Sequence, residues 1–175
     1  LFEYLWNGER EDWDSLAKIL YENDDQRRIL LQTEYIWDED ASEWTPYQTW
    51  GYTYDSYGNK TLEENYHWDE HKQEWFGWMK WEMEFSGWWV ITSRADYEWD
   101  PGRKDWKGTC KNTMDRDANG NVILDRDYAW DTLSWDWENR GAGEYYFNAR
   151  GDTTLFVYYE KDSAEKKGSS GESLL

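Results

Sequence analysis

The sequence predicts an all-β fold in which five β-hairpin repeats of 31 residues form one antiparallel, up-and-down meander of about ten strands. Three observations support this prediction: aromatic residues recur every 31 residues, apolar residues alternate with a period of two, and turn residues separate the alternating stretches. Because an aromatic sheet face has to be covered, we expect a strongly coiled single sheet that wraps its own aromatic face. An open elongated ribbon and a closed barrel of about ten strands are the alternatives.

Three aromatic columns define the repeat. The first column is Trp6, Trp37, Trp68, Trp99 and Trp130, and the second, seven residues later, is Trp13, Trp44, Trp75, Trp106 and Trp137. The third, two residues before the first, is Tyr4, Tyr35, Tyr66, Tyr97, Tyr128 and Tyr159. Each Trp pair flanks a short loop, so its rings are expected to face each other across the base of that loop. Rings at strand spacing are usually core residues, and both Trp columns are expected to be largely buried.

Each unit is expected to be one long hairpin, with units at about residues 4–34, 35–65, 66–96, 97–127 and 128–160. Residues 161–175 are polar and rich in Gly and Ser, which is typical of a tail or linker. Before the turn, residues of equal parity are expected to share a face: Trp44, Pro46, Gln48, Trp50, Tyr52 and Tyr54 in the second unit, and Trp75, Gly77, Met79, Trp81, Met83 and Phe85 in the third.

Turns are predicted near residues 24, 55, 87, 118 and 149. In the second unit Asp55 stands first in the turn and Gly58 fourth, which fits a type I turn followed by a left-handed residue. The loops between the two Trp columns, such as 69–74, should all lie at the same edge of the sheet.

The turn segments also carry a family resemblance. Residues 54–59 (Tyr-Asp-Ser-Tyr-Gly-Asn) and 117–121 (Asp-Ala-Asn-Gly-Asn) alternate with Tyr-x-Trp-Asp and a second Trp. This pattern, over residues 4–159, resembles the Tyr-Asp-x-x-Gly-Asn tandem repeats of secreted and surface proteins in Bacteroidota-type bacteria, and more distantly the YD repeats of Rhs-type proteins. The resemblance implies a β-rich repeat and an extracellular or cell-surface location, and it carries over no catalytic residues. Leu1 falls inside a unit, as expected of a mature or trimmed piece of a longer protein.

Composition excludes several functions. Of the 175 residues only 38% are hydrophobic, yet 20% are aromatic and 16 are Trp, so any core is built from rings. The formal net charge of -19 argues against binding to nucleic acid or to anionic membranes. There is no apolar run long enough for membrane insertion.

Off-column aromatic residues are the candidates for ligand binding. The CH faces of sugars stack on exposed rings, and repeated sites add avidity. The candidates are Trp78, Trp88, Trp89, Trp135 and Tyr47. By their parity, Trp78 and Tyr47 should face away from the main aromatic layer. His67 and His71 are interpreted as surface residues.

Carboxylates flank the loops between the Trp columns, with Asn7 in place of the first of them in the first unit. Asp69, Glu74, Asp100 and Asp105 are the residues that a hard cation such as calcium would use. Asp in a turn usually accepts bonds from the amides of that turn, so capping is the favoured interpretation, with no metal or other cofactor. Five copies of the same pair also argue against catalysis, which needs only one.

These observations together favour a non-enzymatic repeat protein that is secreted or displayed at the cell surface. Its expected partner is a glycan or another extracellular protein, with a role in ligand binding or adhesion. The alternative is a structural scaffold or spacer whose Trp columns are all internal.

Overall fold

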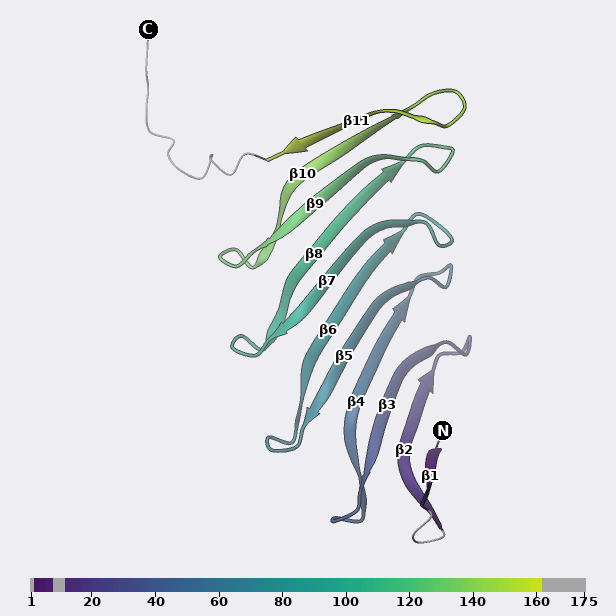
Figure 1. Cartoon of the computed structure of the whole chain (residues 1–175), viewed down its shortest axis with the longest axis vertical. Coiled ribbons are helices and arrows are strands. Elements are labelled where there is room, and N and C mark those ends of the chain that lie inside the picture. Colours follow the sequence, from purple (N-terminus) through teal and green to yellow (C-terminus); the bar gives the residue numbers. More distant parts are fainter. Residues whose placement is uncertain (1, 8–11, 162–175) are drawn as a thin grey trace.

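The computed structural model describes residues 2–7 and 12–161, the side chains of residues 3–7 and 12–16 excepted. The chain forms one antiparallel sheet whose eleven strands follow each other in sequence order. No described residue is helical, and the sheet is open (Figure 1). The predicted all-β single meander is confirmed, and it is not closed into a barrel. The strands are β1 (Phe2–Asn7), β2 (Asp12–Asn23), β3 (Ile29–Asp38), β4 (Glu43–Tyr54), β5 (Lys60–Asp69), β6 (Glu74–Phe85), β7 (Ile91–Asp100), β8 (Asp105–Arg116), β9 (Val122–Asp131), β10 (Asp136–Phe147) and β11 (Thr153–Glu160).

Equivalent connections of the repeats lie on the same side of the sheet. The turns within the hairpins, such as 55–59 between β4 and β5, lie along the right-hand side of Figure 1. The loops between paired Trp residues, such as 70–73 between β5 and β6, lie along the left-hand side. The turn positions and the common side of the loops agree with the prediction.

The fourth turn position is left-handed in all five turns. Gly58 has φ 86° and Gly120 has φ 87°, as the predicted turn type requires. The equivalent Arg27 and Trp89 have φ 64° and 60°, which is unfavourable for residues with a Cβ. In the first and third units the turn geometry is therefore imposed by its surroundings rather than by the residue itself.

A β-bulge interrupts the strand that follows each second-column Trp. In the third unit Tyr66 pairs with Gly77 and Asn65 pairs with Met79, so the ladder skips Trp78. One extra residue reverses the alternation beyond it. Trp75 and Gly77 therefore lie on one face, while Met79, Trp81 and Met83 lie on the other, and the predicted shared parity is wrong. The skipped residues recur every 31 positions: Leu16, Tyr47, Trp78, Thr109 and Arg140.

The same bulge shifts the pairing register in the second unit. Tyr35 pairs with Pro46 and Glu34 with Gln48, so the ladder skips Tyr47. Consequently Trp44 and Pro46 share one face, and Gln48, Trp50 and Tyr52 share the other. We call the side with the paired Trp and Tyr columns the Trp-pair face, and the side that carries His67, Phe76 and Trp81 the bulge face.

The sheet has almost no enclosed core. Ala95 is the buried hydrophobic residue of the described part of the chain, and each strand contacts chiefly its immediate neighbours. Because no second layer covers the sheet, the Trp columns are less buried than predicted, and the sheet does not wrap its aromatic face. The column rings are half-buried at Trp37, Trp44, Trp68, Trp99, Trp106, Trp130 and Trp137, and 36% exposed at Trp75. Trp6 and Trp13 pair through their backbones, but their side chains lie outside the described residues.

Candidate functional site

The paired Trp rings of each unit form edge-to-face contacts on the Trp-pair face. Their ring centroids lie 5.3 Å apart for Trp37–Trp44, 5.2 Å for Trp68–Trp75, 5.2 Å for Trp99–Trp106 and 5.1 Å for Trp130–Trp137. This is a favoured geometry for aromatic pairs. The predicted cross-loop pairing of the two columns is therefore present in each of these four units.

The Tyr column joins each unit to the next. The ring of Tyr66 meets Trp106 at 5.6 Å and that of Tyr97 meets Trp137 at 5.7 Å, both edge-to-face. The indole Nε1 of Trp137 also donates to the Tyr97 hydroxyl at 3.3 Å. Burial raises the pKa of Tyr97 to about 12. The rings thus form a ladder that couples neighbouring hairpins.

Lysines lie over this ladder. Lys18 sits 4.1 Å from the ring centroid of Tyr35, and Lys80 lies at the same distance from Tyr97. Lys111 occupies the equivalent position over Tyr128 at 5.2 Å. Cation–π contacts of this kind occupy the ring faces that a sugar would need. The ladder is therefore better suited to packing than to ligand binding.

Glycines make room for the ladder. A Cβ added at Gly77 would overlap the rings of Trp99 and Trp106, and one at Gly108 would overlap those of Trp130 and Trp137. These rings of the next unit therefore pack directly on the backbone of the preceding one.

The loop carboxylates act as caps and inter-loop acceptors. Asp69 Oδ1 accepts the amides of His71 and Lys72, each at 3.1 Å. The Lys72 ammonium binds the other oxygen at 2.7 Å and holds the pKa of Asp69 below its ordinary value. Asp100 repeats this arrangement with the amides of residues 102 and 103.

The two remaining candidate metal ligands reach the next loop instead. Glu74 pairs with Lys104 Nζ at 3.3 Å, and Asp105 accepts the indole Nε1 of Trp135 at 3.2 Å. Within the described ranges no three His, Cys, Asp or Glu side chains are grouped to hold a metal ion. These carboxylates are placed for capping and for joining loops.

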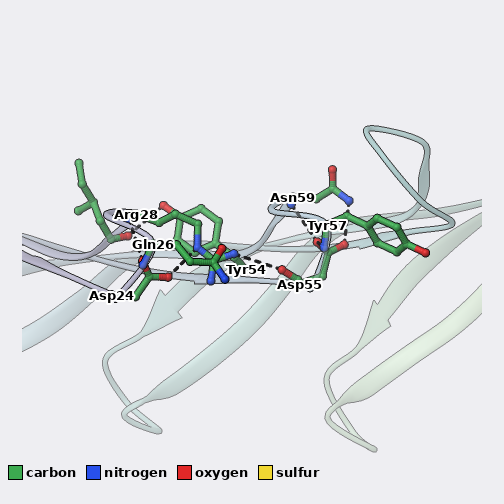
Figure 2. Close-up of polar contacts among 8 residues, drawn as sticks. Asp24, Gln26, Arg28, Tyr54, Asp55, Tyr57 and Asn59 are labelled. Carbon is green, nitrogen blue, oxygen red and sulfur yellow. Dashed lines mark hydrogen bonds and ion pairs between the residues drawn. The ribbon is translucent and has the colours of Figure 1, made fainter.

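Side chains also staple successive hairpin turns. Asn59, which is 0% exposed, donates through Nδ2 to Asp55 Oδ2 in its own turn at 2.8 Å and to the Gly87 carbonyl of the next turn at 2.7 Å. Its Oδ1 accepts the amide of Trp89 at 2.9 Å, which helps to hold that residue left-handed. Arg28 occupies the equivalent position one unit earlier and donates to the Asp55 carbonyl at 3.3 Å (Figure 2).

The off-column rings meet on the bulge face, where Tyr47, His67 and Trp78 form what we call the aromatic platform. Tyr47 on β4 lies 5.8 Å from His67 on β5, and Trp78 on β6 lies 5.1 Å from the same His67, between ring centroids. Tyr47 is 45% exposed and Trp78 is 51% exposed. Both are bulge residues, so the bulges of β4 and β6 each place an additional ring on this face.

Apolar and polar groups surround the platform. Phe76 lies 6.1 Å from His67 between ring centroids, and Met79 is exposed beside it. Trp78 borders a hollow of about 450 Å³ that Glu98 and Pro101 also line. Burial lowers the pKa of His67, so its ring is neutral at physiological pH and keeps one donor and one acceptor.

The other predicted ligand residues lie apart from the platform. Trp88 and Trp89 are 72% and 74% exposed at the turn between β6 and β7, on the opposite side of the sheet from the loops. Trp135 is half-buried, with the Arg103 guanidinium 4.1 Å from its ring centroid and Trp130 at 5.6 Å. Trp135 thus serves the contacts between loops.

Sequence reasoning missed His67, which was interpreted as a surface residue. Strand pairing places it between Tyr47 and Trp78, because β5 lies between β4 and β6. The signal was the 31-residue spacing of the two off-column rings, which puts them at equivalent places in adjacent units. That spacing could point to His67 only once the positions of the bulges were known.

Comparison with known proteins yields structural likenesses only. No family model and no curated protein sequence matches this chain. A protein of unknown function from Bacteroides fragilis is 18% identical, with a TM-score of 0.46, over 70% of this chain and 87% of that one. A DUF3836 family protein from Bacteroides vulgatus is 19% identical, with a TM-score of 0.46, over 57% of this chain and 98% of that one. Another DUF3836 family protein, from Parabacteroides distasonis, is 13% identical, with a TM-score of 0.39, over 53% of this chain and 88% of that one. At these scores the likenesses carry no argument about function.

Proposed function

We propose that this chain is a non-enzymatic, secreted or cell-surface repeat protein that binds a glycan at the aromatic platform. One observation carries the proposal: two exposed rings, Tyr47 and Trp78, converge around His67 next to a hollow. Neither ring belongs to the columns that couple the repeats.

The chemistry of the platform suits a neutral sugar. The CH groups of a pyranose carry a partial positive charge and stack on the electron-rich face of an aromatic ring. Sugar hydroxyls need acceptors and donors at the rim, which Glu98 and the neutral imidazole of His67 supply. The net charge of -19 opposes uronic acid or sulfated polymers.

The first test is binding to a panel of neutral and acidic polysaccharides, measured by native affinity electrophoresis and by titration calorimetry. Trp78→Ala should abolish binding of the neutral polysaccharide that the parent protein recognises, because it removes the most exposed ring of the platform.

Trp88→Ala is the matched control, since it removes an equally large and more exposed indole at the turn between β6 and β7. Its binding should equal that of the parent protein. Loss of binding in Trp88→Ala with retention in Trp78→Ala would move the site to that turn and overturn the proposal.

A structural scaffold or spacer is the alternative function. The inter-turn bonds of Asn59 and the Tyr–Trp contacts between units favour it, because they stiffen an extended array. Absence of binding across the whole panel would leave this interpretation. Binding to an extracellular protein through the same platform would appear as protein capture that Trp78→Ala abolishes, in a parent protein that binds no polysaccharide of the panel. None of the described residues forms a helix that could cross a membrane.

A further inference from the structure

We infer that the platform binds a linear, extended, β-linked neutral glycan that crosses the strands, with successive sugar rings over Tyr47, His67 and Trp78. The inference rests on the proposed glycan-binding function and deepens it. It specifies the linkage class of the ligand, its direction on the sheet and its minimum length.

The direction follows from the arrangement of the three residues. They lie on three consecutive strands, β4, β5 and β6, and form a row that crosses the strands obliquely, since Gln48 pairs with His67 whereas Trp78 lies between the partners of Tyr66 and Asn65. Their consecutive centroid distances of 5.8 Å and 5.1 Å place Tyr47 and Trp78 at most about 11 Å apart. A glycan that contacts all three must therefore run across the strands rather than along them.

The linkage class follows from the spacing. Adjacent strands lie about 4.8 Å apart, so bulge residues of successive units are about 10 Å apart, close to the length of two sugar rings in an extended β-linked chain. In such a chain every second sugar ring presents the same face, so equivalent faces recur at this interval. An α-1,4-linked chain curves, and its rings do not stay in a straight row.

The surroundings favour a run of a few sugars. Beyond Trp78 the row meets the hollow beside Glu98, whose carboxylate pairs with Lys107 at 2.8 Å and marks a polar end. Beyond Tyr47 the exposed Ile36 on β3 extends the apolar row by one strand. Hydroxyl acceptors at one end and apolar surface at the other suit an uncharged oligosaccharide that follows the row of inclined rings.

The test uses β-1,4-linked glucose oligomers of increasing length, with α-1,4-linked oligomers of the same lengths as controls, in titration calorimetry. A trisaccharide is the shortest ligand that spans Tyr47 to Trp78. The β-linked trisaccharide should bind at least about tenfold more tightly than the disaccharide, and the α-linked series should show no such step.

Tyr47→Ala is the discriminating variant. It should lower the affinity for the β-linked trisaccharide to that of the disaccharide, because it removes one of the three rings. Tyr57→Ala, which removes an exposed turn tyrosine, should change neither value.

The outcomes separate the inference from the function beneath it. If Trp78→Ala abolishes glycan binding but affinity shows no step at the trisaccharide, or the α-linked series binds equally well, the inference is overturned and the function stands. If no oligomer or polysaccharide binds the parent protein, both fall.

Discussion

Replacing Asn59 by alanine should destabilise the protein by about 3 kcal/mol, because this residue joins two hairpins through buried hydrogen bonds. The structure supplies the magnitude. The side chain makes three bonds, to Asp55, to the Gly87 carbonyl and from the Trp89 amide, at 2.7 to 2.9 Å, and it is 0% exposed. Each hydrogen bond contributes about 1 kcal/mol net, and the two backbone groups of the next turn would lose their partner.

Asn121→Ala is the matched control. Asn121 holds the equivalent place two units later and donates to Asp117 in its own turn at 2.9 Å. In the described residues it has no bond to the following turn, so its loss should cost only about 1 kcal/mol. Urea unfolding followed by circular dichroism measures both values. Equal losses for the two variants would show that the bonds between turns contribute nothing and would refute the reasoning.

Two other predictions follow from the Trp-pair face. Gly108→Ala should lower the free energy of unfolding in urea by about 2 kcal/mol, because its Cβ would overlap Trp130. Gly51→Ala should be neutral, since its Cβ would meet only the flexible Glu64 at 3.3 Å. A neutral Gly108→Ala would contradict the close packing of the Trp130 ring on the Gly108 backbone. The pKa of Tyr97 is raised to about 12 from an ordinary value of 10, so the folded state holds the phenol proton more tightly than the unfolded state does. The contribution of this proton to stability is therefore complete below pH 10 and is lost between pH 10 and 12. Tyrosinate absorbance should show a late-titrating group whose ionisation accompanies unfolding, and one transition centred at pH 10 would contradict this.

The repeat and its hairpins could be predicted because they depend on local chemistry. Asp55 and Gly58 suit one turn type, and pairs such as Trp68 and Trp75 flank a loop too short to let the strands diverge. A fixed period then extends each local conclusion to every unit.

The faces of the strands could not be predicted by counting alternation. A bulge inserts one residue without changing the 31-residue period, so Trp78 looks like an ordinary strand residue in the sequence. The error placed Met79 and Trp81 on the wrong face. It also concealed that His67 lies between Tyr47 and Trp78.

Burial of the Trp columns was overestimated for a different reason. The sequence reveals which residues are apolar, but enclosure depends on a second layer that this sheet does not have. Trp75 therefore remains 36% exposed although it belongs to a structural column.

The openness of the array is the central claim, since an open sheet leaves both of its faces, the bulge face included, accessible to a ligand. It can be tested by electron–electron double resonance between spin labels on β2 and β11, attached at Leu20→Cys and Leu155→Cys in a Cys110→Ser background. Both leucines are exposed, at 49% and 52%. An open sheet separates these strands by nine steps of about 4.8 Å, so the account predicts a distance of about 40 Å. A distance below about 20 Å, as when β1 pairs with β11, would contradict it.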